Sequence, residues 1–470
     1  MSSDGPSLPS ASETVRKVAG GEQSPVEVIE TALRRVEAMS PTLNALVTLS
    51  DTAMDQARDL EARLQGGEEA GPLCGLPVGI KDVTPVRGLR HTCGSPLYAD
   101  NIAEVDAVVV QRLRDAGAII LGKTNTPEFA TGANTFNEVF GATRNPWNPE
   151  LSAGGSTGGG AAGLATGMID IAEGTDLGGS LRIPASFCGV VGIRPTPGLV
   201  PTWPSDYPWD TMQATGLMAR TAEDLAMALQ AVAGPSPLAP IGESIDYRDF
   251  VELVQSRPVK GMRLAYCSDI ASIGIDPDVE RVCREAIDAL AAAGATVEEI
   301  ELDLSYARAA FLALRGYWMV AQHHTRLERR AEFGDNLRNN VEAGLGTPTM
   351  EFAAAEQVRG RVWEQFRQLF RRFDHLLTPT MAIPPFAVEQ NYPESIAGKP
   401  METYIDWVAP TFLLSLTGLP VASVPAGLDA GGLPVGMQIV AGPGGEGHAL
   451  SAAAAVQSLR PIGAPALLQV

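Results

Sequence analysis

Two serines in glycine-rich segments are the residues of this chain best suited to covalent chemistry. Ser156 lies in Gly154-Gly155-Ser156-Thr157-Gly158-Gly159, and Ser180 lies in Asp176-Leu177-Gly178-Gly179-Ser180-Leu181-Arg182. Glycines beside a serine allow backbone N–H groups to converge near its hydroxyl, which is what an oxyanion hole for acyl transfer requires. Either segment alone could be an ordinary tight turn, but two of them so close together favour a nucleophilic serine.

A serine hydroxyl is a weak nucleophile until a base takes its proton. Lys81 is the candidate base, because it ends the apolar run Leu76-Pro77-Val78-Gly79-Ile80. Burial in an apolar setting disfavours an ammonium ion and strongly lowers the pKa of a lysine, which gives a neutral amine near neutral pH. The other interpretation is a lysine at the end of a strand whose charge extends into water.

The alternative to a lysine base is a nucleophile elbow, a sharp turn that presents the serine to a histidine base. Gly154-x-Ser156-x-Gly158 matches the G-x-S-x-G pattern of an α/β-hydrolase with Ser156 as nucleophile. Such an elbow needs a strand that leads directly into the serine, whereas the proline-broken segment 144–149 precedes it here. None of the histidines stands in an obvious catalytic setting with a nearby acid: His91, His323, His324, His375 and His448.

Two nucleotide-binding patterns also occur, and we interpret both as accidental. Gly117-Ala-Ile-Ile-Leu-Gly122-Lys123-Thr124 fits the P-loop expression, but its middle is an apolar strand where a phosphate loop is needed. Gly158-x-Gly160-x-x-Gly163 fits the dinucleotide fingerprint without a strand before it. A nucleotide-binding module therefore remains only as an alternative from a different functional class.

The elements around these residues alternate between strands and helices. In the first half the pattern predicts strands at 76–81, 118–121 and 168–173, and helices at 106–116, 158–167 and 221–233. Capping residues predict helix starts at Ser24, with Glu27 at N3, and at Thr221, with Asp224 three residues on. In the second half the pattern predicts strands at 262–267, 295–300, 375–378, 421–424 and 436–440, and a helix at 277–293. This rhythm predicts an α/β fold with a large mixed, mostly parallel central sheet covered by helices on both faces.

Domain organisation follows from the same pattern. Residues 1–20 are polar and serine-rich and predict a flexible N-terminal tail, and residues 21–470 predict a single domain. A proline-rich connection at 234–242 divides a core at 21–235 from the remaining core at 236–470, which includes a helical cover at about 305–373.

The amino-acid composition limits the kinds of binding partner that we expect. The chain has 35 Lys+Arg against 55 Asp+Glu, a net charge of −20, which repels nucleic acid and anionic membrane surfaces. We see neither a signal peptide nor an apolar membrane span, and the five cysteines form no C-x-x-C pair. We therefore expect a cytoplasmic protein, monomeric or homodimeric, with a small-molecule substrate, no nucleic-acid or membrane partner, and no metal.

Several segments in fixed order resemble the amidase signature family. They are Lys81-Asp82, Gly122-Lys123-Thr124-Asn125, Gly155-Ser156-Thr157-Gly158-Gly159 and the stretch from Asp176 to Pro184. The resemblance covers roughly residues 20–460 and is densest between 75 and 225. It implies the amidase signature fold and a reaction that needs no metal or organic cofactor.

The resemblance also implies a Ser-cisSer-Lys triad. Ser180 would be the nucleophile, Ser156 the bridging serine after a cis peptide bond, and Lys81 the base. The backbone N–H groups of Leu177, Gly178, Gly179 and Ser180 would form the oxyanion hole, and Ala130 would line the acyl-binding cleft. Asp176 and Arg182 would support this loop without reacting.

The activity implied is hydrolysis of C–N bonds in amides through an acyl-enzyme on Ser180. Aromatic residues outside the signature, such as Trp203, Tyr207 and Trp318, favour aryl amides and anilides if they line the site, and the other interpretation is core packing. Carbamates (urethanes) and esters are open to the same machinery. Leu177 stands where the transamidating subunit of tRNA-dependent amidotransferases usually has threonine. An amidotransferase A-type subunit stays open as an alternative, although the pattern is closer to stand-alone amidases.

Overall fold

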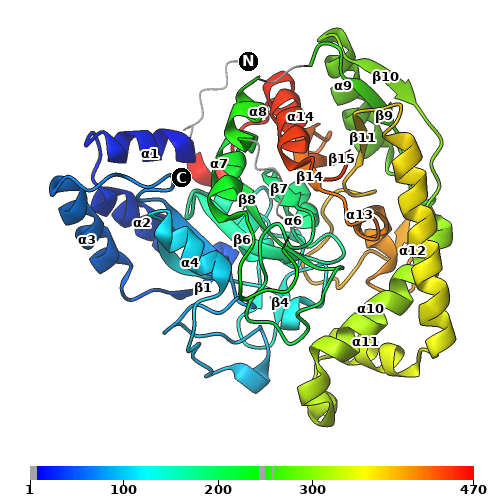
Figure 1. Cartoon of the computed structure of the whole chain (residues 1–470), viewed down its shortest axis with the longest axis horizontal. Helices are drawn as coiled ribbons and strands as arrows, with labels where there is room; N and C mark the ends of the chain where they lie inside the picture. The colour runs from blue at the N-terminus through cyan, green and yellow to red at the C-terminus, as the bar shows by residue number, and fades with distance from the viewer. Residues whose placement is uncertain (1–7, 243–248, 257–258, 470) are drawn as a thin grey trace.

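A central sheet of eleven strands organises the computed structural model, which describes residues 8–242, 249–256 and 259–469 (Figure 1). The strands lie in the order β1-β3-β2-β6-β8-β7-β14-β15-β11-β9-β10. Their bounds are β1 Leu46–Leu49, β2 Pro77–Lys81, β3 Ile119–Thr124, β6 Ile171–Asp176, β7 Val191–Arg194, β8 Ala214–Ala219, β9 Arg263–Tyr266, β10 Thr296–Glu299, β11 His375–Pro379, β14 Val421–Leu428 and β15 Pro434–Ala441. Two small hairpins lie apart from it, β4 Phe136–Asn137 with β5 Gly141–Ala142, and β12 Ser395–Ile396 with β13 Lys399–Pro400.

The α/β class with a large mixed sheet and helices on both faces is confirmed. Parallel pairing occurs in two regions, where β2 pairs with β3 and β6, and where β9 pairs with β10 and β11. The strands between these regions, from β6 to β11 in sheet order, pair in antiparallel fashion. One cause is visible in the chain itself, because the short turn between β14 and β15 leaves no room for a crossover and forces a hairpin.

Helices cover the sheet on both sides. Their bounds are α1 Ala11–Ala19, α2 Pro25–Leu43, α3 Ala53–Gln65, α4 Val108–Asp115, α5 Gly158–Ala165, α6 Arg182–Cys188, α7 Ala222–Val232, α8 Phe250–Ser256, α9 Pro277–Ala292, α10 Arg308–Gln322, α11 Asp335–Gly346, α12 Thr349–Leu369, α13 Ala409–Ser415 and α14 Glu446–Leu459. Alternate residues of β3 separate the two faces: Ile120 packs with the core of α4, α7, α9 and α14, whereas Ile119 and Leu121 pack with that of α2, α3 and α5.

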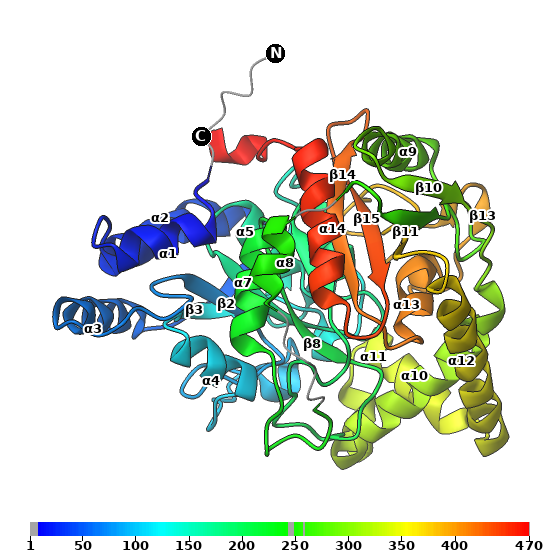
Figure 2. The same ribbon diagram turned by 45° about the horizontal axis from the view of Figure 1, so that its top comes forward.

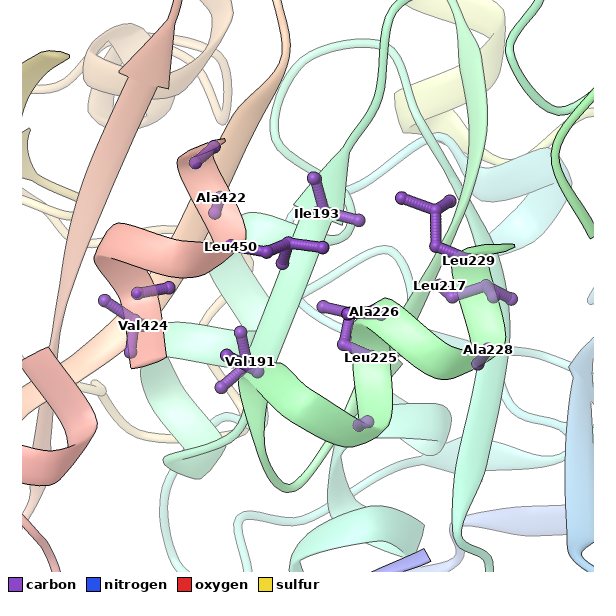
Figure 3. Close-up of a cluster of buried hydrophobic side chains, with 14 of the residues drawn as sticks. Val191, Ile193, Leu217, Leu225, Ala226, Ala228, Leu229, Ala422, Val424 and Leu450 are labelled. Atoms are coloured by element: carbon purple, nitrogen blue, oxygen red, sulfur yellow. The ribbon is translucent and has the colours of Figure 1, made fainter. Parts of the chain in front are cut away.

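Figure 3 shows one of these cores at the middle of the sheet. Val191 and Ile193 of β7 and Leu217 of β8 meet Leu225 of α7 and Leu450 of α14, and all five side chains are buried. Burial of such side chains is the dominant favourable contribution to folding. The core thus holds the middle strands of the sheet against α7 and α14.

Two helix starts predicted from capping residues are confirmed. Ser24 caps α2, where its hydroxyl accepts from the N–H of Val26 at 3.0 Å and Glu27 accepts from the N–H of Ser24 at 3.2 Å. Thr221 caps α7 and accepts from the N–H of Asp224 at 3.1 Å.

The N-terminal segment differs from the flexible tail expected for 1–20. Residues 1–7 lie outside the described part of the chain, but Ala11–Ala19 forms α1, with Ser10 as its N-cap. The carboxylate of Asp224 accepts from the N–H groups of Ala11 and Ser12 at 3.0 and 2.9 Å. A distant side chain thus completes the start of this helix, which local composition could not reveal.

The helical cover expected at about 305–373 contains α10, α11 and α12, which lie together at one end of the molecule (Figure 2). Helices α10 and α11 cross closely at Gly316 and Gly344, where a Cβ on Gly344 would stand 2.2 Å from the Gly316 carbonyl oxygen. Among the residues that the structure describes, we find no helix long and apolar enough to cross a membrane.

Candidate active site

Lys81 ends β2 inside the protein, with none of its surface exposed. Its Nζ lies 2.6 Å from Ser156 Oγ and 3.2 Å from Thr175 Oγ1, in a buried hydrogen-bonded group. The sheet sets this geometry, because β2 runs parallel to β6 with Ile80 opposite Glu173. The interpretation of Lys81 as an exposed lysine at a strand end is therefore wrong.

Burial has opposite effects on the two titratable groups at this point of the sheet. It lowers the pKa of Lys81 to about 7, although the charges of Glu173 and Asp176 act in the other direction. It raises the pKa of Glu173, which hydrogen bonds from Thr84 and from the Lys81 backbone N–H partly offset. Burial thus favours the neutral form of each group.

Ser156 sits on a tightly enclosed loop that leads into α5. The peptide bond between Gly155 and Ser156 is cis, as the family resemblance implies. A Cβ on Gly155 would stand 2.8 Å from the Ala133 carbonyl carbon, so only glycine fits this approach of two backbone segments. Ser156 is fully buried, and the partner of its hydroxyl is the Lys81 amine, with no histidine involved.

The loop that carries Ser180 follows β6 and is fixed by Asp176. Asp176 Oδ1 accepts from the N–H of Gly179 at 2.8 Å, and Oδ2 accepts from the N–H of Leu181 at 3.2 Å. Arg182 donates to both oxygens, at 2.9 and 3.0 Å. Burial alone would raise the pKa of Asp176, but the Arg182 and Arg194 guanidinium groups lower it to about 2.

These bonds correct one part of the expected oxyanion hole. The N–H of Gly179 already donates to Asp176, so it has no second hydrogen to offer a reacting oxygen. The N–H groups of Leu177, Gly178 and Ser180 make no such hydrogen bond to a side chain or loop carbonyl among the described residues and remain candidates. Gly179 has a φ of +124°, and its role in this structure is to shape the loop.

Ser180 opens into a cavity of about 50 Å³. Its walls include Gly155, Thr175, Leu177 and Gly178, which places the lysine–serine group and the Ser180 loop around one space. Apolar and aromatic side chains form most of the remainder: Phe129, Ala130, Ala133, Ile183, Phe311, Trp318, Met319, Ile405, Val408 and Phe412. Of the predicted site residues, Ala130, Leu177, Gly178 and Ser180 therefore line one cavity, and Ser156 and Lys81 adjoin it through the lining residues Gly155 and Thr175.

A second, larger cavity of about 290 Å³ adjoins the first. The two share five residues in their walls: Phe129, Ala130, Thr175, Gln213 and Trp318. The second cavity is more polar and includes His91, Cys93 and Arg326, and burial lowers the pKa of His91 to about 3, which keeps its ring neutral. Ser180 lines only the first of the two cavities.

Neither nucleotide pattern adopts the geometry that phosphate binding requires. Lys123 is buried in β3, and its Nζ lies 3.1 Å from Asp82 Oδ1 in an ion pair that is closed to solvent. Gly158 and Gly160 of the dinucleotide pattern are buried in α5, where a Cβ on Gly160 would stand 3.0 Å from the Ala172 Cβ of β6. These glycines and this lysine serve packing and ion pairing in the core.

Sequence reasoning missed several polar residues of the site, among them Thr175, Glu173 and Arg315. Thr175 and Glu173 contact Lys81 from β6, and Arg315 of α10 enters the wall of the Ser180 cavity. Thr175 and Glu173 lie beside the recognised Asp176-to-Arg182 segment, and the alternation of a strand could have directed attention to them. No local pattern marks Arg315.

Known proteins resemble this chain over nearly its whole length. A family model described as Amidase matches residues 27–450. The chain is 35% identical over 459 residues to an acylamidase of Rhodococcus erythropolis, covering 96% of this chain and 95% of the relative. It is 34% identical over 480 residues to the A-type subunit of the glutamyl-tRNA(Gln) amidotransferase of Carboxydothermus hydrogenoformans, covering 95% and 96%.

A solved structure gives the same result for the fold. The chain superposes on a bacterial aryl acylamidase of the amidase signature enzymes with a TM-score of 0.89 and 30% identity, covering 96% of each chain.

Proposed function

The chain belongs to the amidase signature family of enzymes that act on C–N bonds, and we propose that it hydrolyses aryl amides and anilides through an acyl-enzyme on Ser180. One observation carries this proposal. The buried Lys81 amine lies 2.6 Å from the Ser156 hydroxyl, beside the cavity that Ser180 lines.

In the proposed cycle, Ser180 Oγ attacks the substrate carbonyl carbon while its proton passes through Ser156 to the neutral Lys81 amine. The developing oxyanion accepts hydrogen bonds from free backbone N–H groups of the loop, of which Leu177, Gly178 and Ser180 are the candidates. Such donors are each worth ~3–4 kcal/mol to the transition state.

The tetrahedral intermediate then collapses. The C–N bond breaks, and the leaving amine takes the proton back from Lys81 through Ser156, which leaves an ester on Ser180. Water attacks that ester, loses its proton along the same path, and releases the acid with Ser180 regenerated. Carbamates and esters differ only in the group attached to the carbonyl, so we include them in the proposed substrate range.

A substrate panel with an active-site control tests the proposal. We expect the protein to cleave p-nitroanilides, simple amides and aryl carbamates, and to be labelled covalently by an aryl phosphonate. Ser180→Ala should lose both turnover and label while its thermal unfolding curve is unchanged. Labelling that persists in Ser180→Ala but disappears in Ser156→Ala would replace Ser180 by Ser156 as the nucleophile.

A role within an amidotransferase complex is the second candidate, because relatives with that name match over nearly the whole chain. Leu177 and the net charge of −20 favour a stand-alone enzyme instead. The two candidates differ in what they require: activity confined to glutamine, and dependent on partner proteins and tRNA, would overturn the hydrolase proposal.

Location and assembly belong to the same proposal. We infer action in the cytoplasm, because the five cysteines are all buried free thiols, which a reducing compartment preserves. We also infer a monomer or homodimer, which light scattering on the purified protein would distinguish from larger assemblies.

A further inference from the structure

Arg315 is a buried cation in the wall of the Ser180 cavity. It projects from α10 with 6% of its surface exposed. Its guanidinium donates to the Asn340 side-chain oxygen and to the Tyr404 hydroxyl, and both of these partners are neutral. Among the described residues, no carboxylate lies within ion-pair distance of it.

The contrast with other buried arginines of this chain is clear. Arg182, which is fully buried, pairs with Asp176 at 2.9 Å, and Arg194 lies 3.9 Å from the same carboxylate. A buried charge without a partner of opposite sign is costly, so proteins seldom keep one unless something else neutralises it. In Arg315 that neutralising group is absent from the parts of the chain that the structure describes.

Tyr404 supplies a second donor at the same place. Its hydroxyl oxygen accepts from Arg315 and, at 2.9 Å, from the Asn340 side-chain amide. A phenol oxygen that accepts two hydrogen bonds has only its own O–H left, and among the described residues Tyr404 is found only as an acceptor. Tyr404 also lines the Ser180 cavity, so a cation and an O–H donor lie together in its wall.

The remaining wall offers nothing that could balance this charge. The cavity has no aspartate or glutamate in its lining, and its larger side chains are apolar, among them Phe311, Met319 and Phe412. The net charge of −20 repels anions at long range, but salt screens that repulsion beyond ~8 Å at physiological ionic strength. Within the cavity the nearby guanidinium dominates.

We propose that Arg315 and Tyr404 form a carboxylate subsite for the acyl part of the substrate. This inference rests on the proposed hydrolysis at Ser180, because the acyl group stays on Ser180 after the amine leaves and so occupies the cavity that Ser180 lines. The preferred substrates are then mono-amides of dicarboxylic acids. A carboxylate bound by a guanidinium forms charge-assisted hydrogen bonds, which are about twice as strong as neutral ones.

Matched anilides test the subsite with one leaving group throughout. Succinyl-p-nitroanilide is compared with butyryl-p-nitroanilide, and glutaryl-p-nitroanilide with valeryl-p-nitroanilide, so that each pair differs only in a terminal carboxylate against a methyl group. We expect kcat/KM to be at least about tenfold higher for the carboxylated member of one pair, since one well-made charged hydrogen-bonded contact is worth that factor.

Variants connect the preference to the residues. Arg315→Met should bring the ratio of kcat/KM within that pair close to one, Arg315→Lys should restore part of it, and Tyr404→Phe should reduce it. Arg372→Met is the matched control, because Arg372 pairs with Glu298 on the exposed surface and should leave the ratio unchanged. Thermal unfolding of each variant reports whether it is folded.

The outcomes separate the two proposals. If none of the four anilides is cleaved, the proposed function fails. If the uncharged anilides are cleaved as well as the charged ones by the unaltered enzyme, the carboxylate subsite is wrong and the hydrolase stands. A carboxylate preference that survives in Arg315→Met would also overturn the subsite.

Discussion

The amine of Lys81 is held between two hydroxyl groups in a region without solvent, and this fixes what its replacement should do. Lys81→Met keeps a similar volume but removes the base. We expect kcat to fall by ~10²–10⁴-fold, the usual contribution of a general base, or further if the proton relay is lost entirely. Steady-state kinetics with a p-nitroanilide measure this, and circular dichroism should show an unchanged fold. A harmless Lys81→Met, together with a lethal change at one histidine, would favour the elbow mechanism.

The same amine determines the pH dependence. Only its neutral form accepts a proton, and burial lowers the pKa of Lys81 to about 7, so kcat/KM should rise with pH through neutrality. The negative charge of Glu173 acts to raise that pKa. We therefore expect Glu173→Gln, which keeps the shape of the side chain, to move this rise to lower pH.

A pH profile of kcat/KM for both proteins checks the shift. A purely structural role for Glu173 would lower the plateau and leave the midpoint in place. Thr84→Val removes a hydrogen bond that lowers the pKa of Glu173 and so favours its neutral form; it should move the rise in the same direction as Glu173→Gln but by less. A midpoint that moves upward in Glu173→Gln would contradict the electrostatic account.

At the scale of elements, the glycines of α5 and α12 should respond in opposite ways to alanine. In α5, a Cβ on Gly159 would stand 2.3 Å from the Asn125 nitrogen and 2.5 Å from the Ala45 carbonyl oxygen. Gly159→Ala should therefore lower the free energy of unfolding by ~1–3 kcal/mol or more, because backbone must move to admit the methyl group. Gly360 is exposed in α12 with nothing within 4 Å. Gly360→Ala should raise the free energy of unfolding by ~0.5–1 kcal/mol, through its better helix propensity.

Urea denaturation of the two variants measures both signs in one experiment. Equal and small effects would mean that α5 can move away from β3, and that its close packing does not restrict residue 159.

The elements that could be predicted are those whose signals are local. The capping residues Ser24 and Thr221 placed the starts of α2 and α7, and the apolar run before Lys81 placed β2. Helix α1 was missed because the residue that completes its start, Asp224, is more than 200 positions away. The antiparallel directions of the central strands could not be predicted either, because they depend on the path that each connection takes across the sheet.

The candidate site shows the same division. Glycine patterns and the family resemblance pointed to Ser156 and Ser180, because glycine is required wherever backbone approaches closely. Glu173 reaches Lys81 only through the register of β2 on β6, and Arg315 reaches the cavity only because α10 packs beside it. Contacts of this kind are properties of the assembled sheet and helices, and no short stretch of sequence contains them.

At the scale of the whole molecule, Arg182 joins the first half of the chain to the last. Its guanidinium bonds Asp176 and also reaches the Thr411 carbonyl and the Gln438 side chain, each at 2.8 Å. Arg182→Leu would leave the Asp176 carboxylate without its main partner in the interior. We expect a loss of about 3 kcal/mol or more in the free energy of unfolding, together with loss of activity as the Ser180 loop is released.

The exposed pair of Arg372 and Glu298, 2.7 Å apart, is the control for that loss. Arg372→Leu removes a surface ion pair and should change the free energy of unfolding by no more than ~0.5 kcal/mol. Chemical denaturation of both variants compares them directly. Similar small effects would mean that water or Arg194 takes over the role of Arg182 around Asp176.

The proposed catalytic residues and the α10 residues of the cavity wall come from different parts of the fold, and this has an evolutionary consequence. Lys81 ends a strand of the sheet and Ser156 lies on the loop before α5, whereas α10 supplies Phe311, Arg315 and Trp318 to the cavity wall. Mutations in that one helix can change which acyl groups fit the cavity without changing the residues that break the bond. Related enzymes could therefore acquire new substrate specificities through substitutions in a peripheral helix, while the residues that break the bond stay the same.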